Sequence, residues 1–432
     1  MQQIAIGLAG LGNVGTGVFI HLVKNRALLT ERLGLDLAVK KIAVRDLSKP
    51  RGVDVPPALL TTRWEDLVDD PSIQVIVELI GGIETPFQLI MRAIEKGKIV
   101  VTGNKALLAE RGREIFAAAT KYKVPVFFEA AAAGGVPIIK AIRESFIGNH
   151  IESVFGIVNG TSNFILTRMT EAGLGFQEAL AEAQAGGYAE ADPSLDVNGW
   201  DAAHKAIILA SLAYGFWVST EAIYVEGIEE ISAADIRFAK ELGYCIKLLA
   251  VIKADEKGEI EVRVHPALIP LSHVLASVNG VFNAVLVRGD VVGDTLFYGR
   301  GAGQDPTSSA VISDLADAAL AIETPRRGYG FTPHELYGKC KFIGTISSQY
   351  YLRLSVDDKP GVLAQIAGIL GDHHIGISSV IQPEAHDESD VPLVLMIHDA
   401  TSEQMHDALQ HIAALPCVKK KPRLIRVENF NK

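Results

Sequence analysis

Short apolar runs alternate with longer amphipathic segments through the first 130 residues of the chain. The first run begins at Ile4, and helical patterns follow it and fill 85–96 and 105–121. Each later run has the length of a buried strand, and these runs lie at 37–44, 73–80, 98–103 and 124–130. The alternation predicts a doubly wound, mostly parallel α/β sheet over residues 1–130.

The pattern changes after residue 150. The strand-like and helical stretches that follow are, in chain order, 154–160, 161–172, 176–186, 259–265, 281–288 and 291–298. We expect residues 131–300 to form a β-sheet with helices on one face. Residues 301–322, with a helix over 306–321, are expected to return to the first domain and complete it.

Residues 350–432 have the pattern of a third unit, after a linker over 323–349 that mixes Pro, Gly and charge without periodicity. Strand, helix, strand, strand, helix and strand are predicted at 350–358, 363–374, 376–382, 392–400, 402–415 and 418–427. This βαββαβ order is typical of a small ferredoxin-like domain.

Composition and charge narrow the function classes. Of the 432 residues, 48% are apolar and 21% charged, which is ordinary for two or three globular domains. The net charge of −10 disfavours a nucleic-acid partner, and the short basic cluster at 419–423 does not change this. The three cysteines form no CxxC pair, so we expect no disulfide framework and a reducing, cytoplasmic location. We see no signal peptide before Ile4 and no apolar run of about 18 residues, so we expect no membrane partner.

Gly10, Gly12 and Gly15 form a G-x-G-x-x-G motif between the first predicted strand and its helix. In such a motif the first glycine allows a tight turn, the second lets a pyrophosphate approach, and the third lets helix pack on strand. The helix N-terminus would then face the phosphates. We therefore expect a dinucleotide to contact this loop, which also contains Asn13 and Val14.

The end of the second strand leaves the choice between NADP and NAD open. The strand ends in Val44-Arg45-Asp46. Arg45, helped by Lys49, could pair with a 2′-phosphate and favour NADP, whereas Asp46 could favour NAD.

The stretch DVNGWDAAHKAIILAS (196–211) carries charges on an otherwise apolar helix. Asp201 and Lys205 lie four residues apart on one face, which a plain i,i+4 salt bridge would also explain. Lys105 opens a helix directly after a strand, where a cation opposes the helix dipole unless an anionic ligand lies there. These three residues are therefore candidates for an active site.

Six motifs, in this order, resemble the homoserine dehydrogenase family over about residues 1–325. They are GLAGLGNVGTG, VTGNKALLA, EAAAAGGVPIIKAI, GIVNGTSNFIL, GYAEADPSLDVNGWDAAHK and GRGAGQDPTSSAV. The resemblance implies a reversible reduction of L-aspartate 4-semialdehyde to L-homoserine with NADPH or NADH. That reaction belongs to threonine, methionine and isoleucine biosynthesis.

The resemblance also implies roles for single residues. Lys205 is the expected proton donor and acceptor, and Lys105 is expected at the junction of cofactor and substrate. A cation suits this chemistry, because hydride arrival places negative charge on the aldehyde oxygen. The expected substrate-holding residues are Glu190, Asp201, Tyr188, Thr161 and Asp196, and two further cofactor positions are Gly187 and Gly303.

The stretch EAAAAGGVP (129–137) resembles the family's monovalent-cation loop. The resemblance places a sodium ion among Glu129 and the backbone carbonyls of Ala132, Gly134 and Val136. From the letters alone, a transition from helix to loop explains the stretch equally well.

The C-terminal unit, with DDKPGVLAQIAGIL and GISSVIQ, resembles an ACT domain, a small amino-acid-sensing module. Gly361 would let an effector approach the backbone, and the resemblance implies feedback control by L-threonine. A role in assembly only stays open. ACT modules commonly pair their sheets, so we expect a homodimer or homotetramer.

Two alternatives remain. One is another NAD(P) oxidoreductase of amino-acid metabolism, but an aspartate-semialdehyde dehydrogenase needs a nucleophilic cysteine. Only Cys245 falls in the expected catalytic domain, in a helical apolar setting that favours packing. The other is a non-catalytic amino-acid sensor, which the intact Lys105, Glu190, Asp201 and Lys205 disfavour.

Overall fold

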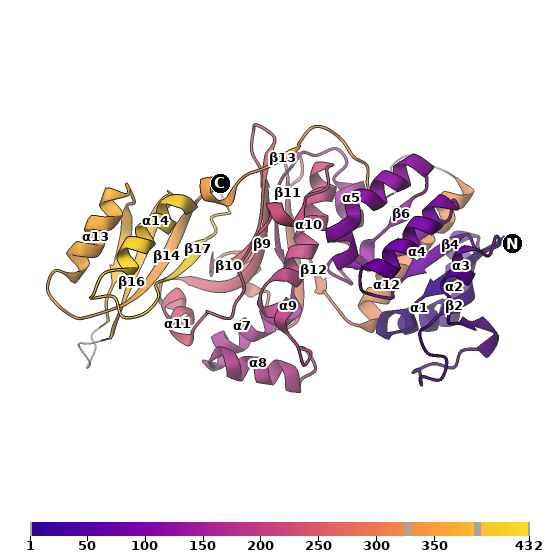
Figure 1. Ribbon diagram of the computed structural model, residues 1–432, viewed down its shortest axis with the longest axis horizontal. Coiled ribbons are helices and arrows are strands. Elements are labelled where there is room, and N and C mark those ends of the chain that lie inside the picture. The colour runs from indigo at the N-terminus through magenta and orange to yellow at the C-terminus, as the bar shows by residue number, and fades with distance from the viewer. Residues whose placement is uncertain (1, 325–329, 384–389, 431–432) are drawn as a thin grey trace.

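The computed structural model describes residues 2–324, 330–383 and 390–430. The molecule is elongated, and the chain passes from one end to the other (Figure 1). The amino-terminal sheet lies at one end, a large mixed sheet in the middle and a small C-terminal domain at the opposite end.

The amino-terminal sheet has six parallel strands in the order β3-β2-β1-β4-β5-β6. Their bounds are β1 Gln3–Ala9, β2 Asp36–Ala43, β3 Leu60–Thr61, β4 Val75–Glu78, β5 Ile99–Thr102 and β6 Val126–Phe127. The order reverses direction between β1 and β4, so their carboxyl ends flank the crevice in which such sheets bind ligands. The predicted doubly wound parallel sheet is confirmed.

Helices cover both faces of this sheet. The helices are α1 Asn13–Lys24, α2 Arg26–Leu33, α3 Glu65–Val68, α4 Glu84–Glu95, α5 Lys105–Tyr122 and α12 Gln304–Glu323. Apolar residues of α1 and α12 share one core with one face of the strands. Those of α3, α4 and α5 share another core with the opposite face. The expected return of the chain to the first domain is therefore made by α12.

The second sheet has eleven strands, nine of them in the order β12-β11-β7-β9-β10-β17-β14-β16-β15. Its middle part, which precedes the C-terminal unit, comprises β7 Ile151–Ile157, β8 Tyr224–Val225, β9 Tyr244–Ala254, β10 Glu259–Pro270, β11 Phe282–Gly289, β12 Gly293–Arg300 and β13 Lys339–Cys340. β8 and β13 are short strands that pair with β10 beside this order.

Helices pack against this middle part of the second sheet. They are α7 Gly160–Ala172, α8 Phe176–Ala185, α9 Ser194–Val197, α10 Trp200–Tyr214 and α11 Ala233–Glu241, and short helical turns including α6 Ile138–Lys140 precede them. α10 packs on β7, β9 and β10 and also against α5 of the first domain. This double contact brings the amino-terminal sheet and the second sheet together beside α10.

The C-terminal unit has the predicted βαββαβ order. Its elements are β14 Ser347–Val356, α13 Val362–Asp372, β15 Ile377–Ile381, β16 Val391–Thr401, α14 Ser402–Ala413 and β17 Arg423–Val427. The four strands stand in the order β17-β14-β16-β15, and both helices contribute to a separate apolar core. This arrangement is the ferredoxin-like fold.

Two expectations need correction. Cys245 lies on strand β9 and not in a helix. β9 alternates between two apolar cores, with Ile246 and Leu248 in one and Leu249 and Val251 in the other. A strand buried on both faces is continuously apolar, and periodicity cannot distinguish it from a buried helix. The expected linker also carries β13, and β14 already begins inside it at Ser347.

Within the described residues, no helix combines the length and the apolar character that a membrane crossing requires.

Candidate functional site

The glycine motif forms the turn from β1 into α1. Gly10 has φ +99°, and a Cβ there would lie 2.5 Å from the carbonyl oxygen of Leu79. A Cβ on Gly15 would lie 2.1 Å from the carbonyl oxygen of Gly10, so no other residue fits inside the turn. Gly12 has open space on its Cβ side, directly before the first turn of α1. An anionic ligand can therefore approach the backbone and the helix N-terminus here.

A cavity of about 600 Å³ extends from this loop across the carboxyl ends of β1, β2 and β4. Arg45 and Lys49 line it together with Asp46. The Asp46 carboxylate accepts hydrogen bonds from the backbone and hydroxyl of Ser48, which hold the pKa of Asp46 below its ordinary value. Arg51, which sequence reasoning missed, donates to the carbonyl oxygen of Lys49 at 2.9 Å and also lines the cavity.

Three of the other expected cofactor positions, Asn13, Val14 and Gly303, lie at the same end of α1. The carbonyl of Asn13 accepts a hydrogen bond from the side chain of Gln304, while Val14 packs against the core of the first domain. Gly303, with φ +120°, precedes α12. Gly187 is exposed and follows α8 in the second domain.

Lys105 is placed by the junction between β5 and α5. The side chain of Asn104 caps α5 by accepting from the amide of Leu107, so Lys105 occupies the first turn. Because α5 packs on α10, the Lys105 ammonium reaches the carboxylate of Asp201, with Nζ 3.0 Å from Oδ1. The two domains therefore meet at an ion pair.

Asp201 binds both lysines. Its Oδ2 lies 2.6 Å from Nζ of Lys205, which also donates to the carbonyl oxygen of Val158 at 2.6 Å. Asp201 is 9% exposed and Lys205 is 8% exposed. The structure thus brings Lys105, Asp201 and Lys205 together from two domains.

The charges of this group act on one another. Burial raises the pKa of Asp201, but Lys205 and Lys105 outweigh it and hold the pKa well below its ordinary value. Burial lowers the pKa of Lys205 and outweighs Asp201. Burial also lowers the pKa of Lys105, but there Asp201 prevails and the net shift is upward. Asp201 therefore stays a carboxylate, and Lys205 releases a proton more easily than a lysine in water.

Asn159 joins the acids and was missed by sequence reasoning. Its amide nitrogen donates to Asp196 at 2.7 Å and to Asp201 at 2.8 Å. Its carbonyl oxygen caps α7 by accepting from the amide of Ser162 at 2.7 Å. The sequence Asn-Gly-Thr-Ser indicates that Asn159 can cap a helix. Its contacts with Asp196 and Asp201 depend on the tertiary fold and are not visible in the sequence.

The remaining expected substrate residues lie at the start of α7 and in the loop that follows α8. Thr161 donates from its hydroxyl to the carbonyl of Tyr188 at 2.7 Å. The Tyr188 ring packs on Phe164 and is largely exposed. Glu190 is exposed, and its charge is among those that raise the pKa of Lys105.

The loop at 129–136 is buried and irregular. Ala133 and Gly134 have φ values of +55° and +47°. The Glu129 carboxylate accepts from the amides of Ile139 and Lys140, and burial raises the pKa of Glu129 to about 7.

The carbonyls of this loop differ in their use. The carbonyl of Val136 accepts from the amide of Ile138 at 2.8 Å. Within the described ranges, the carbonyls of Ala132 and Gly134 accept no hydrogen bond although both residues are buried. Backbone oxygens of this kind fit a hard cation, whereas the Glu129 side chain is already engaged in capping.

Comparisons with known proteins agree along the whole chain. Residues 10–129 match the family described as "Homoserine dehydrogenase, NAD binding domain", residues 137–316 match "Homoserine dehydrogenase", and residues 350–417 match "ACT domain". A homoserine dehydrogenase of Pseudomonas aeruginosa is 45% identical, with 100% of both chains covered. One of Synechocystis sp. is 44% identical over 99% of this chain and 100% of its own.

Solved structures give the same result. The crystal structure of a homoserine dehydrogenase from Thiobacillus denitrificans superposes with a TM-score of 0.92 at 45% identity, covering 99% of both chains. That of Staphylococcus aureus homoserine dehydrogenase at pH 7.5 has a TM-score of 0.78 at 33% identity, again over 99% of both chains.

Proposed function

Because this chain belongs to the homoserine dehydrogenase family, and is therefore an oxidoreductase with a nicotinamide-cofactor domain, we propose that it interconverts L-aspartate 4-semialdehyde and L-homoserine. The observation that carries the proposal is the carboxylate of Asp201 between the ammonium groups of Lys105 and Lys205. The pathway we propose is the one that leads to threonine, methionine and isoleucine, and the proposed location is the cytoplasm.

In this reaction a bound NAD(P)H would supply the hydride. Lys205 would donate a proton to the aldehyde oxygen as negative charge develops there, and would take it back in the reverse direction. Burial lowers the pKa of Lys205, which makes it a better acid than an exposed lysine. Asp201, Asp196 and Glu190 would hold the ammonium of the substrate, with Thr161 and Tyr188 at nearby positions.

The test is NADPH oxidation in the presence of aspartate semialdehyde, with the wild type compared with Lys205→Ala. Lys205→Ala should lose at least about a hundredfold in kcat, the usual value of acid–base catalysis. Retained NADPH binding by the variant, followed by cofactor fluorescence, shows that it is folded. An inactive wild type, or near-normal turnover of the variant, contradicts the proposal.

For the cofactor we propose a preference for NADP. Arg45 and Lys49 place two positive charges on the cavity beside β2, and Asp46, which also lines it, has its carboxylate bound to Ser48 of its own loop. Arg45→Ala should lower kcat/KM for NADPH at least about tenfold and leave that for NADH nearly unchanged, since a charged hydrogen bond contributes about 1.5–3 kcal/mol. Equal losses with both cofactors would count against this preference.

We also propose that the loop at 129–136 binds a sodium ion through backbone carbonyls that include those of Ala132 and Gly134. Their lack of hydrogen-bond partners within the described residues supports this. Sodium chloride should then raise the melting temperature more than tetramethylammonium chloride at equal ionic strength, because a ligand of the folded state stabilises it. Equal melting temperatures would exclude a sodium site.

The ACT domain is consistent with a small-molecule effector, and we propose L-threonine. Gly361 has φ +90° before α13, and nothing lies within 4 Å of its Cβ position, so an amino acid can approach the backbone there. Threonine should slow the reaction, and an unchanged rate would favour a role in assembly only. We further propose a homodimer or homotetramer, which light scattering of the purified chain tests.

A further inference from the structure

The last strand, β17, lies between β10 and β14 in the eleven-stranded sheet. Arg426 and Val427 pair in parallel with Ala267 and Leu268 of β10, while the strand as a whole pairs antiparallel with β14. β17 is therefore the strand that connects the C-terminal strands with the middle strands of the second sheet (Figure 1).

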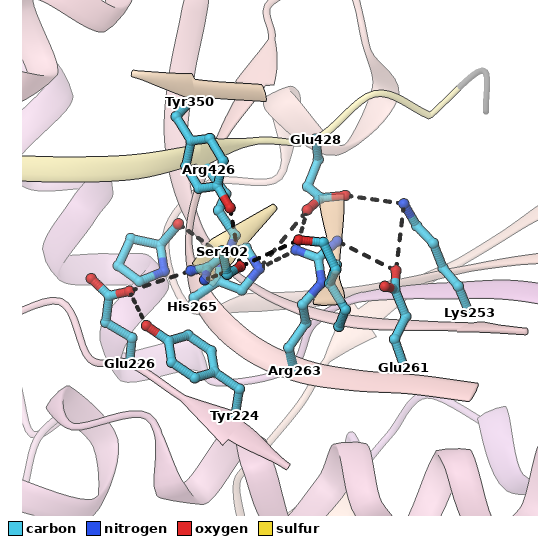
Figure 2. Close-up of polar contacts among 12 residues, drawn as sticks. Tyr224, Glu226, Lys253, Glu261, Arg263, His265, Tyr350, Ser402, Arg426 and Glu428 are labelled. Atoms are coloured by element: carbon cyan, nitrogen blue, oxygen red, sulfur yellow. Dashed lines mark hydrogen bonds and ion pairs between the residues drawn. The ribbon is translucent and has the colours of Figure 1, made fainter. Parts of the chain in front are cut away.

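Buried charges fasten β17 to β10. Glu428, directly after the strand, contacts the guanidinium of Arg263 and lies 3.3 Å from Nζ of Lys253 (Figure 2). Arg263 and Glu428 are each 2% exposed. Separating buried partners of this kind leaves uncompensated charges, so β17 and β10 move as one unit.

Two arginines of β17 reach across to Glu226, which follows β8 in the catalytic domain. Arg423 Nη2 lies 3.2 Å from one carboxylate oxygen of Glu226, and Arg426 Nη1 lies 3.8 Å from the other. Tyr224 donates its hydroxyl to that second oxygen at 3.0 Å, beneath the Arg426 guanidinium (Figure 2). Glu226 is therefore held from the side of the C-terminal domain.

The backbone next to Glu226 packs on the segment that leads into α10. The amide of Ile228 donates to the carbonyl of Val197 at 2.8 Å. A Cβ on Gly227 would lie 2.2 Å from the same carbonyl, and one on Gly199 would lie 3.2 Å from the carbonyl of Glu226. These two backbone segments fit together without room for a side chain, so a shift of one displaces the other.

Gly199 is the N-cap residue, directly before α10. It has φ +89°, and Asp201 stands in the first turn that follows. Lys205 is one turn further, held by Asp201. A small displacement of this first turn therefore changes the position of both reacting charges.

We propose that Glu226 is a positioning residue, through which the arginines of β17 hold the first turn of α10 and with it Asp201 and Lys205 in the reactive arrangement. The inference rests on the proposed roles of Asp201 and Lys205. It makes the C-terminal strand part of the support of the catalytic site, and it gives that domain a physical route to the reaction.

The test compares Glu226→Gln with Glu230→Gln in the full-length enzyme. Glu230 also pairs with Arg423, through Nη1 at 2.9 Å, but its exposed side chain is not attached to backbone that contacts α10. Glu226→Gln should lower kcat about tenfold with less than about a threefold change in KM for aspartate semialdehyde, because small misplacements of reacting groups are costly. Glu230→Gln should keep kcat within about twofold of the wild type.

A second arm removes the link from the other side. Arg423→Gln should also lower kcat, and the double variant with Glu226→Gln should be no slower than the slower single variant, as coupled residues are not additive. Should Glu226→Gln fail to fold, Arg423→Gln alone carries the test.

Normal kcat in the folded Glu226→Gln or Arg423→Gln variant, or an equal loss in Glu230→Gln, overturns the inference. Multiplying losses in the double variant overturn it as well. An inactive wild type, or an active Lys205→Ala, instead refutes the proposed function, so the two failures are distinguishable.

Discussion

Replacing Asp201 by Asn removes one negative charge and leaves the shape of the side chain almost unchanged. In the wild type that charge lies 2.6 Å from Lys205 and 3.0 Å from Lys105, and both Asp201 and Lys205 are almost closed to solvent. In the variant, Lys205 keeps its burial, which lowers its pKa, and loses the carboxylate that raises it. The pKa of Lys205 must therefore fall.

The size of the effect follows from the geometry. Two unit charges 2.6 Å apart interact by about 6 kcal/mol at an effective dielectric constant of about 20. Relaxation and water entry reduce this value, but even about 1.4 kcal/mol changes the proton affinity tenfold. In the proposed mechanism, reduction of the aldehyde needs protonated Lys205, so its rate should decline as pH rises through the pKa of that lysine. We expect this alkaline decline to move to lower pH by at least about one unit in Asp201→Asn.

The measurement is kcat for aldehyde reduction from about pH 6 to 10, at saturating substrate and NADPH, a range that spans the titration of a lysine with lowered pKa. Asp196→Asn is the matched control, because Asp196 shares the Asn159 amide with Asp201 but makes no ion pair with either lysine in the described structure. The alkaline decline of kcat should move less in Asp196→Asn than in Asp201→Asn. An alkaline decline that stays in place in Asp201→Asn, or moves to higher pH, would refute the assignment of Lys205 as the acid.

Two further predictions concern stability and cofactor binding. Glu428→Gln removes the nearest carboxylate of the buried Arg263 and of Lys253 and leaves them the more distant Glu261, so at pH 7 we expect a loss of about 3 kcal/mol, measured by chemical unfolding. Burial raises the pKa of Glu428, but Arg263 and Lys253 outweigh it and hold the pKa at about 2, so the wild-type contribution is complete above pH 4.5 and disappears as the pH falls toward 2. The variant should consequently lose less stability than the wild type over that acid range, and an identical acid profile would contradict the assignment. Gly15→Ala places a methyl group against the carbonyl of Gly10, so NADPH binding, measured by fluorescence titration, should weaken at least about tenfold, and unchanged affinity would show that the turn is not needed.

The order of elements was predictable because local pattern determines it. The glycine motif, the alternating strands and helices of the first domain and the βαββαβ order of the last one all agree with the structure. β9 was not predictable in the same way, since cores on both its faces remove the alternation that identifies a strand. Cys245 was placed in a helix for that reason.

The site was predictable as a set of residues but not as an arrangement. The motifs named Lys105, Asp201 and Lys205, and the structure joins them in one ion-paired group. No pattern in the sequence indicated the link between β17 and Glu226, because its members lie about 200 residues apart and each looks like a solvated surface charge. Contacts of this kind depend on which strands become neighbours, and that is decided by the tertiary fold.

The salt bridge between Asp201 and Lys205 is part of the candidate site and does not argue against it. Both oxygens of Asp201 are engaged, one with Lys105 and the other with Lys205 and Asn159. In the proposed reaction, the ammonium of the substrate would compete with one of the lysines for this carboxylate. The side chain of Lys105 is 41% exposed and makes the longer contact, whereas that of Lys205 is 10% exposed and also bound to the carbonyl of Val158. In the proposed reaction we therefore expect Lys105 to be the partner that exchanges, and Lys205 to stay in place beside the aldehyde oxygen.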